Sequence, residues 1–203
     1  TPRSGSSAAS DVYKRQVLAS RIGYVGELGF ELHIPSEFAI HVYKELWQSG
    51  QEMDIANVGY RAIESLRMEK GYLYWSGDIS PDYSPLEAGL GFRVHFDLKD
   101  DFLGRQALES QMKNGLDRKL FTFVSEQFLP LTGGETILES DRVVSLATSV
   151  AYGFTVKKTI IRGYLDRLYW GKTEFTVEVF GQRYPVKLAS SPVYDPKNLA
   201  LKG

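Results

Sequence analysis

A nine-residue segment, Gly23–Glu31, constrains the fold of this 203-residue chain more than any other. Its inner glycines, Gly26 and Gly29, can adopt positive φ without steric cost and therefore favour a tight turn, and the residues around them alternate as strand residues do. If the residue before Gly26 pairs with the residue after Gly29, Tyr24 lies opposite Glu31 on one face of a hairpin. The other face is apolar and consists of Phe30, Leu32 and Ile34. The segment predicts a hairpin with one face in the core and one face available for a ligand. An exposed hairpin with a solvated glutamate is the alternative.

The composition excludes several classes of function. The formal net charge is −1 and 43% of the residues are hydrophobic, which indicates a soluble globular protein with one or two cores. Cationic residues alternate with acidic ones, so no basic stripe for nucleic acid is expected, and no apolar run is long enough to span a membrane. The chain has no cysteine, and its three histidines lack partners at metal-ligand spacing. We therefore expect no nucleic acid, no membrane and no structural metal.

Residues 1–16 differ from the rest of the chain. The first ten are rich in serine, alanine and glycine, and Asp11–Gln16 looks like the translation of a transposon end used in sequencing libraries. We interpret 1–16 as non-native sequencing read-through that is disordered. A targeting peptide is the alternative, which the lack of an amphipathic repeat disfavours. On the first interpretation, the natural protein continues upstream.

Residues 17–118 alternate between extended and helical patterns. Pro35 ends the hairpin and Ser36 offers an N-cap to a helix with an apolar residue at every fourth position from Phe38, while Gly71 offers a C-cap to a second helix. The expected elements are a hairpin over 20–34, helices over 37–49 and 60–70, an irregular loop over 72–82, a strand over 91–96 and a helix over 103–114.

After Arg118 the chain changes to short alternating segments separated by glycine, aspartate, serine and proline. Regularly spaced short strands of this kind are typical of a small β-barrel or sandwich. The strands are expected at 119–124, 142–149, 158–166, 173–180 and 183–189. The fold class is therefore α+β, with a junction near 117–119.

Four motifs in a fixed order resemble one family. They are Gly23–Glu31, Gly59–Tyr72, Ser84–Phe92 (SPLEAGLGF) and Phe102–Leu108. Together they are similar to the folate-binding aminomethyltransferase (glycine-cleavage T-protein) family and to the carboxy-terminal region of sarcosine and dimethylglycine dehydrogenase-like flavoenzymes. The resemblance covers nearly everything from Ser20 onward. It implies a partial aminomethyltransferase fold, with the C-terminal portion of the folate-binding domain over 17–118 and the C-terminal β-barrel over 119–203.

Three details resemble sarcosine dehydrogenases more than the stand-alone T-protein: the string Glu69–Tyr72 (EKGY), Trp75 and the ending Tyr194–Leu199. The resemblance implies that a domain containing FAD, absent from this chain, oxidises an N-methyl amine such as sarcosine, and that the folate part passes the one-carbon unit to tetrahydrofolate. The mitochondrial matrix is implied for a eukaryotic source and the cytoplasm for a bacterial one. The T-protein itself, dimethylglycine dehydrogenase and the regulatory subunit of pyruvate dehydrogenase phosphatase share the architecture and stay open as alternatives.

The same resemblance implies that Tyr24 and Glu31 hold the pterin ring of folate and that Arg61 contacts the ligand. A carboxylate offers two acceptor oxygens to the adjacent donors of a pterin, and a guanidinium offers donors to a pterin carbonyl or to Glu31 itself. The family's catalytic aspartate is expected upstream of this chain, so no catalytic residue is assigned and the chain alone is expected to be inactive.

Several other residues are predicted to have structural roles. Arg67 is expected to pair with Glu64 on the helix surface, and Glu87 to cap a turn or to bind. Asp78, in a loop, receives no role. Aromatic core or wall positions are expected at Tyr60, Trp75 and Tyr83.

Overall fold

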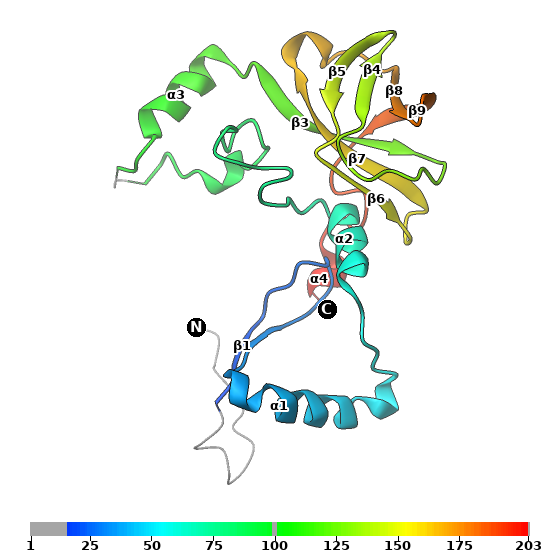
Figure 1. Cartoon of the computed structure of the whole chain (residues 1–203). Coiled ribbons are helices and arrows are strands. Elements are labelled where there is room, and N and C mark those ends of the chain that lie inside the picture. The colour runs from blue at the N-terminus through cyan, green and yellow to red at the C-terminus, as the bar shows by residue number, and fades with distance from the viewer. Residues whose placement is uncertain (1–15, 99–100, 203) are drawn as a thin grey trace.

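A computed structural model describes residues 16–98 and 101–202 (Figure 1). A curled β-sheet lies at one end, α2 lies in the middle, and a small hairpin with α1 lies at the other end. The elements are β1 (Leu18–Ser20), β2 (Glu31–His33), α1 (Ser36–Ser49), η2 (Gln51–Met53), α2 (Tyr60–Glu69), η3 (Gly91–Arg93), α3 (Arg105–Asn114), β3 (Arg118–Ser125), β4 (Thr136–Glu139), β5 (Arg142–Leu146), β6 (Ser149–Gly153), β7 (Lys158–Asp166), η4 (Arg167–Tyr169), β8 (Phe175–Val179), β9 (Gln182–Ala189) and α4 (Leu199–Lys202). Residues 1–15 lie outside the described part, so the interpretation of 1–16 stays a prediction.

The curled sheet forms the main core. Its seven strands follow the order β5-β4-β8-β9-β3-β7-β6, every pair is antiparallel, and β5 also packs against β7. Apolar side chains at alternate strand positions fill the interior, among them Phe123, Ile161, Phe175 and Val177. The predicted carboxy-terminal β-domain is therefore confirmed.

Two details of that prediction were wrong. The strand β4 was missed, and the strand expected over 142–149 ends at Leu146 as β5, while β6 begins at Ser149 and continues to Gly153. The division arises because the backbone changes partner: Ala147 donates its N–H to Glu135 O at 2.8 Å, whereas Thr148 donates to Arg162 O at 2.8 Å. A sequence window cannot reveal this exchange, because both partners are distant in the chain.

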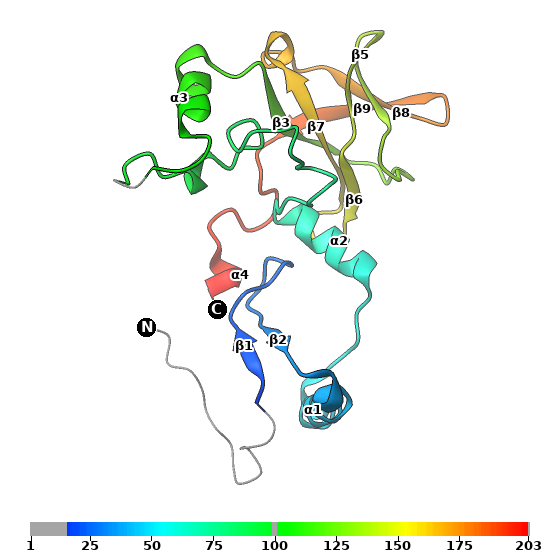
Figure 2. The same ribbon diagram turned by 60° about the vertical axis from the view of Figure 1, so that its left-hand side comes forward.

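The amino-terminal hairpin differs from the expected one. Strands β1 and β2 pair Ser20 with Glu31, and the residues between them form an irregular loop (Figure 2). The expected pairing of Tyr24 opposite Glu31 is therefore wrong. Tyr24 instead turns toward the strand-free segment after α2, where its hydroxyl donates to Leu73 O at 2.6 Å. Tertiary contacts to the loop thus replace the tight turn that its glycines favour.

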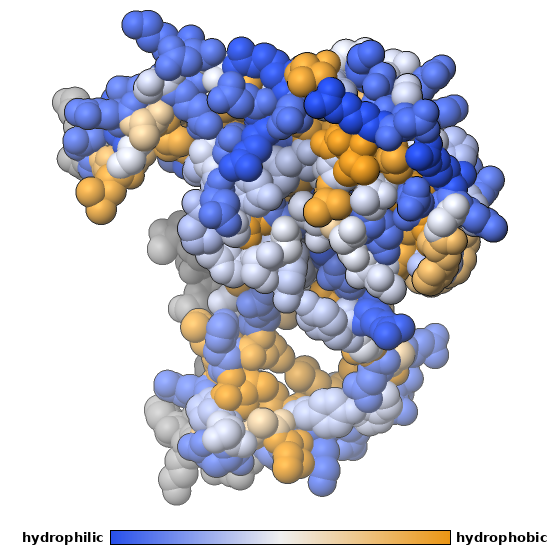
Figure 3. Space-filling model, turned by 45° about the horizontal axis from the view of Figure 1, so that its top comes forward, coloured by the Kyte–Doolittle hydropathy of each residue, from blue (hydrophilic) through white to orange (hydrophobic). Residues whose placement is uncertain are grey.

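Helix α1 forms where expected, but its apolar face is only partly covered. No residue of α1 is buried, and Ile40 is 71% exposed. Pro35 occupies the N-cap position, and the Ser36 side chain makes no cap hydrogen bond. Figure 3 shows apolar side chains gathered beside a hollow in the lower half of the molecule. The amphipathic pattern therefore predicted the helix correctly, although its apolar face is only partly covered: Phe38 and Val42 are half-buried and Leu46 is 46% exposed.

The segment between α2 and β3 differs from the prediction at one element. The strand expected over 91–96 is instead the short helix η3, because Arg93 and Val94 donate their N–H groups three residues back, to Leu90 and Gly91. Helix α3 was predicted well and ends at Gly115. No helix in the described part is long and apolar enough to cross a membrane.

Candidate functional site

A buried ionic network joins α2 to the curled sheet. Its centre is Asp78, which is 0% exposed. One carboxylate oxygen accepts from Arg67 Nη1 at 2.7 Å and from Arg162 Nη1 at 3.5 Å, and the other accepts from Thr148 Oγ1 at 2.7 Å. The Asp78 carbonyl accepts from the Tyr164 hydroxyl at 2.9 Å. We call Arg67, Asp78 and Arg162 the junction network, and it fixes the position of the loop after α2 on β7.

Arg67 was expected on the helix surface, and this was wrong. Its predicted bond to Glu64 is present, yet its side chain is only 1% exposed. Arg67 also donates to Ser149 Oγ at 2.8 Å and to Tyr72 O at 3.2 Å. The i, i+3 spacing to Glu64 did not predict these contacts, because they depend on how the loop after α2 folds back and on Ser149, 82 residues further along the chain.

A cavity of about 870 Å³ lies beside the junction network, and Arg162 forms part of its lining. This volume is in the range of pockets that enclose small-molecule ligands. The charged residues that line it within the described part of the chain are all cations: Lys70, Arg93, Lys119 and Arg162. Its aromatic lining comes from Tyr24, Tyr72, Phe92 and Phe121. Flat rings and cationic groups suit a flat ligand that carries acceptor oxygens.

Arg162 is the least satisfied residue of this wall. Its guanidinium donates through Nη1 to Tyr72 O at 2.9 Å, but Nε and Nη2 are buried and have no acceptor among the described residues. Burial lowers the pKa of Arg162, with the Asp78 carboxylate opposing that effect. Because an unpaired buried N–H is costly, an acceptor at this position would be favourable.

Tyr24 is the one predicted site residue that lines the cavity. Its ring stacks on Tyr72 with a centroid separation of 5.8 Å and an interplanar angle of 13°. Burial raises the pKa of the Tyr24 hydroxyl, so this group remains a hydrogen-bond donor at neutral pH. The tyrosine of the motif therefore lies in the wall of the cavity, against Tyr72.

The other two predicted site residues lie elsewhere. Glu31 is exposed on β2, Arg61 is exposed in the first turn of α2, and neither lines the cavity. The structure thus does not bring Tyr24, Glu31 and Arg61 together through direct contact.

The structure places Glu87 and Tyr83 as predicted, but not Tyr60 and Trp75. Glu87 caps a turn as expected, since Ser84 N–H donates to it at 2.8 Å and Ser84 Oγ accepts from Glu87 N–H at 3.1 Å. Tyr83 is a packed aromatic, stacked on Tyr164 at 3.8 Å. Tyr60 and Trp75 were expected in the core or a wall, but both are exposed.

Sequence reasoning missed Asp78, Lys70 and Arg162 as site components. Arg162 did leave a signal, because it interrupts the apolar run of a strand otherwise expected to be buried. A charged residue in such a place is expected to have a buried partner or a ligand.

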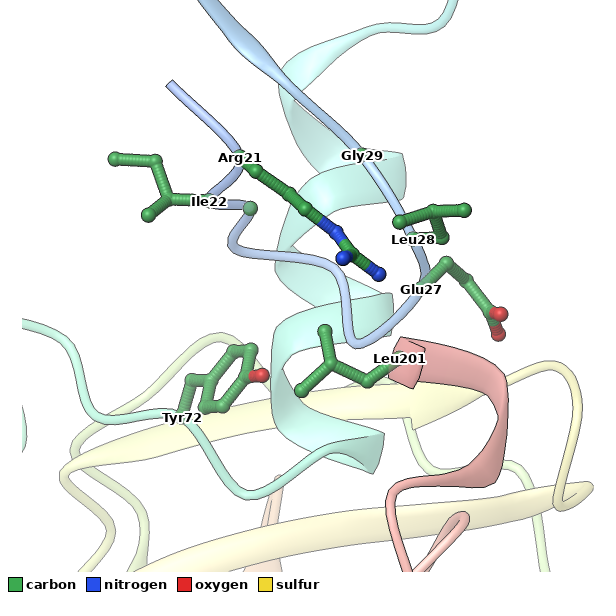
Figure 4. A pocket seen from close by; sticks show the side chains of 8 residues that line it. Arg21, Ile22, Glu27, Leu28, Gly29, Tyr72 and Leu201 are labelled. Atoms are coloured by element: carbon green, nitrogen blue, oxygen red, sulfur yellow. The ribbon is translucent and has the colours of Figure 1, made fainter. Parts of the chain in front are cut away.

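A second, smaller pocket of about 250 Å³ adjoins the first and shares Gly23 and Tyr72 with it (Figure 4). It lies between the irregular loop, where Arg21 and Glu27 contribute side chains, and Leu201 of α4. The carboxy-terminal segment therefore forms part of the wall of the site region. No group of three or more histidine, aspartate or glutamate side chains suited to a metal gathers in the residues that the structure describes.

The sequence of the chain matches two domain families. The GCVT N-terminal domain matches residues 4–98, and the glycine cleavage T-protein C-terminal barrel domain matches residues 118–195. Sarcosine dehydrogenase, mitochondrial, from Mus musculus is 40% identical over 195 residues, which are 92% of this chain and 21% of the relative. Dimethylglycine dehydrogenase, mitochondrial, from Homo sapiens is 34% identical over 180 residues, which are 87% of this chain and 21% of the relative.

A solved structure supports the same fold. The crystal structure of glycine cleavage system aminomethyltransferase T from Bartonella henselae aligns with a TM-score of 0.77 and 26% identity, over 86% of this chain and 49% of that chain. The chain spans 21% of the length of the dehydrogenases that it matches.

The curled sheet, the cavity beside it and these matches define the class of protein, which has an aminomethyltransferase-like fold. The chain belongs to the glycine-cleavage T-protein family, whose matched relatives include sarcosine and dimethylglycine dehydrogenases.

Proposed function

We propose that this chain supplies the tetrahydrofolate-binding region of a sarcosine dehydrogenase-like flavoenzyme. Such an enzyme oxidatively demethylates an N-methyl amine at FAD, which binds a domain outside this chain, and passes the one-carbon unit to tetrahydrofolate. The observation that carries the proposal is the 870 Å³ cavity, with its stacked Tyr24 and Tyr72 and its cationic lining. The 40% identity to a sarcosine dehydrogenase favours this relative over the others.

The residues present fit a folate. Tetrahydrofolate, when bound, supplies the nitrogen that accepts the one-carbon unit. Its flat pterin suits the aromatic wall, and its carbonyl oxygens suit the unpaired N–H groups of Arg162. Tyr24 covers the ligand, Arg162 binds an acceptor oxygen, and Asp78 holds Arg162 in place through Nη1.

Glu31 and Arg61 belong to the proposal as folate ligands. Glu31 lies in β2 and Arg61 lies in the first turn of α2, and apolar side chains of β2 and α1, such as Leu32 and Ile40, are exposed. We propose that further polypeptide covers these apolar side chains in the whole enzyme and encloses Glu31 beside the pterin. This assignment is tested separately from that of Arg162.

Replacement of Arg162 by methionine is expected to weaken tetrahydrofolate binding about tenfold or more, because a hydrogen bond from a charged donor is lost. The free energy of unfolding should fall by less than the roughly 3–5 kcal/mol typical of a buried ion pair that loses one partner, because Arg162 lies 3.5 Å from Asp78, whose other partners remain. Asp78 keeps its bonds to Arg67 and Thr148 in this variant. Isothermal titration of the whole enzyme with tetrahydrofolate measures the first effect, and urea unfolding measures the second.

A matched control for this experiment is Arg142→Met, which removes a cation from the exposed edge strand β5. It should leave folate affinity unchanged. Equal affinities of the Arg162→Met variant and the parent would remove Arg162 from the site.

The 203-residue chain alone is expected to show no one-carbon transfer, because the family's catalytic aspartate has no counterpart within it. The measurement is formation of methylenetetrahydrofolate from sarcosine by the purified chain, with the whole enzyme as positive control. Turnover by the chain alone would contradict the proposal.

Sequencing the coding region upstream of this chain tests the proposal that the whole protein is a flavoenzyme. The coding sequence upstream should contain a βαβ unit with the GxGxxG fingerprint of a dinucleotide-binding domain. If it encodes only the first half of an aminomethyltransferase, the chain is part of a stand-alone T-protein instead.

A further inference from the structure

A buried ion pair joins two sequence features that resemble sarcosine dehydrogenases, the EKGY string and the carboxy-terminal ending. Lys70 Nζ donates to Asp195 Oδ2 at 2.7 Å and to Asp195 O at 2.8 Å, and the two side chains are 2% and 10% exposed. The hydrogen bond from Lys70 lowers the pKa of the Asp195 carboxyl. The two residues are 125 positions apart, so only the fold brings them together.

The aliphatic part of the Lys70 side chain supports the Gly-rich loop. Gly26 has φ +81°, and a Cβ added to it would lie 2.6 Å from Lys70 Cγ and 2.8 Å from both Cβ and Cδ. The loop backbone therefore rests directly on the lysine, at a position where only glycine fits without strain. Tyr24, which lines the large cavity, is two residues before this contact.

The carboxy-terminal segment holds the loop from the other side. The Tyr194 hydroxyl donates to Glu27 Oε1 at 2.7 Å, and Leu28 N–H donates to Ala200 O at 3.2 Å. The Asp195 carboxylate also accepts the N–H groups of Leu199 and Ala200 at 2.8 and 3.2 Å. Asp195 thus both pairs with Lys70 and orders the turn that precedes the contact with Leu28.

We infer that Asp195 is a positioning residue that acts through Lys70, and that this pair holds the loop 23–29 in the conformation that directs Tyr24 toward the cavity. The inference deepens the proposed function and rests on it for the identity of the ligand. Its structural part concerns only the order of the loop and stands independently of that ligand.

Two conservative variants isolate the pair. Asp195→Asn removes the charge but keeps one oxygen, which can still accept the N–H of Leu199. Lys70→Met removes the ammonium group but keeps an aliphatic side chain under Gly26. The control is Lys197→Met, which removes an exposed cation from the same segment.

Amide hydrogen exchange, measured in the whole enzyme without ligand, reports how well the loop 23–29 is ordered. In both variants the amides of residues 23–29 should exchange about tenfold faster, while amides of β3 and β7 keep the protection of the parent. The double variant should show the same acceleration as either single variant, because the two substitutions break one interaction. A purely global loss of stability would instead accelerate exchange in β3 and β7 as well.

Tetrahydrofolate affinity is measured on the same proteins at a temperature well below their unfolding transitions. Both single variants and the double variant should bind about tenfold more weakly, and Lys197→Met should bind like the parent. Unchanged loop exchange in both single variants would overturn the inference, as would faster exchange with unchanged affinity. If the parent enzyme does not bind tetrahydrofolate, the proposed function fails, and the exchange data still decide whether the pair orders the loop.

Discussion

Replacement of Asp78 by alanine is expected to reduce the free energy of unfolding by about 3–5 kcal/mol. The reason is that Arg67 and Arg162, each 1% exposed, share this one buried carboxylate. Its removal leaves the charge of Arg162 buried without a carboxylate partner, whereas Arg67 keeps Glu64, and it also removes the acceptor of the Thr148 hydroxyl. Urea unfolding followed by far-ultraviolet circular dichroism gives the value.

The matched control for that experiment is Asp117→Ala. Asp117 also faces an arginine, Arg167, but at 3.9 Å and with its own side chain fully exposed to solvent. Exposed ion pairs of this kind contribute about 0–1 kcal/mol. A loss of less than about 1 kcal/mol on Asp78→Ala would show that the junction network is not a source of stability.

In the whole enzyme, Glu31→Gln is expected to weaken tetrahydrofolate binding by about 2 kcal/mol or more while leaving amine oxidation at the flavin unchanged. The amide replaces a charged acceptor by a neutral one and can set an N–H2 group against the pterin donors. Titration with tetrahydrofolate measures the affinity, and anaerobic reduction of the flavin by sarcosine measures the oxidation.

Glu27→Gln provides the matched comparison, because it changes the other carboxylate of the same motif. Its Oε1 accepts from Tyr194, and a glutamine oxygen can accept the same hydrogen bond. This variant should bind tetrahydrofolate within about threefold of the parent, a difference below 1 kcal/mol. If Glu27→Gln is the more damaging substitution, the ligand carboxylate is Glu27, and the assignment of Glu31 is wrong.

Local sequence patterns correctly predicted the helices that end at a glycine stop signal and the strands whose side chains follow a regular pattern. Helices α2 and α3 end where Gly71 and Gly115 take positive φ, at +81° and +82°, and both glycines were recognisable as stop signals. The strands β3, β7, β8 and β9 were predicted because their side chains alternate between the core and the outside or are buried as a continuous run. In contrast, η3 was mistaken for a strand, because a short apolar run does not reveal whether a neighbouring strand exists to pair with it.

By itself, the sequence determined the family, through four motifs in order, and the type of most helices and strands, since these depend on neighbouring residues. Only the tertiary structure decided which side chains of the motifs share a site. It turned Tyr24 into the cavity, left Glu31 and Arg61 exposed, and buried Arg67 against Asp78. It also joined Lys70 to Asp195. The physical reason is that hydrogen bonds and ion pairs between buried groups depend on distance in space. Residues far apart in the sequence leave no periodic pattern from which their contact could be predicted.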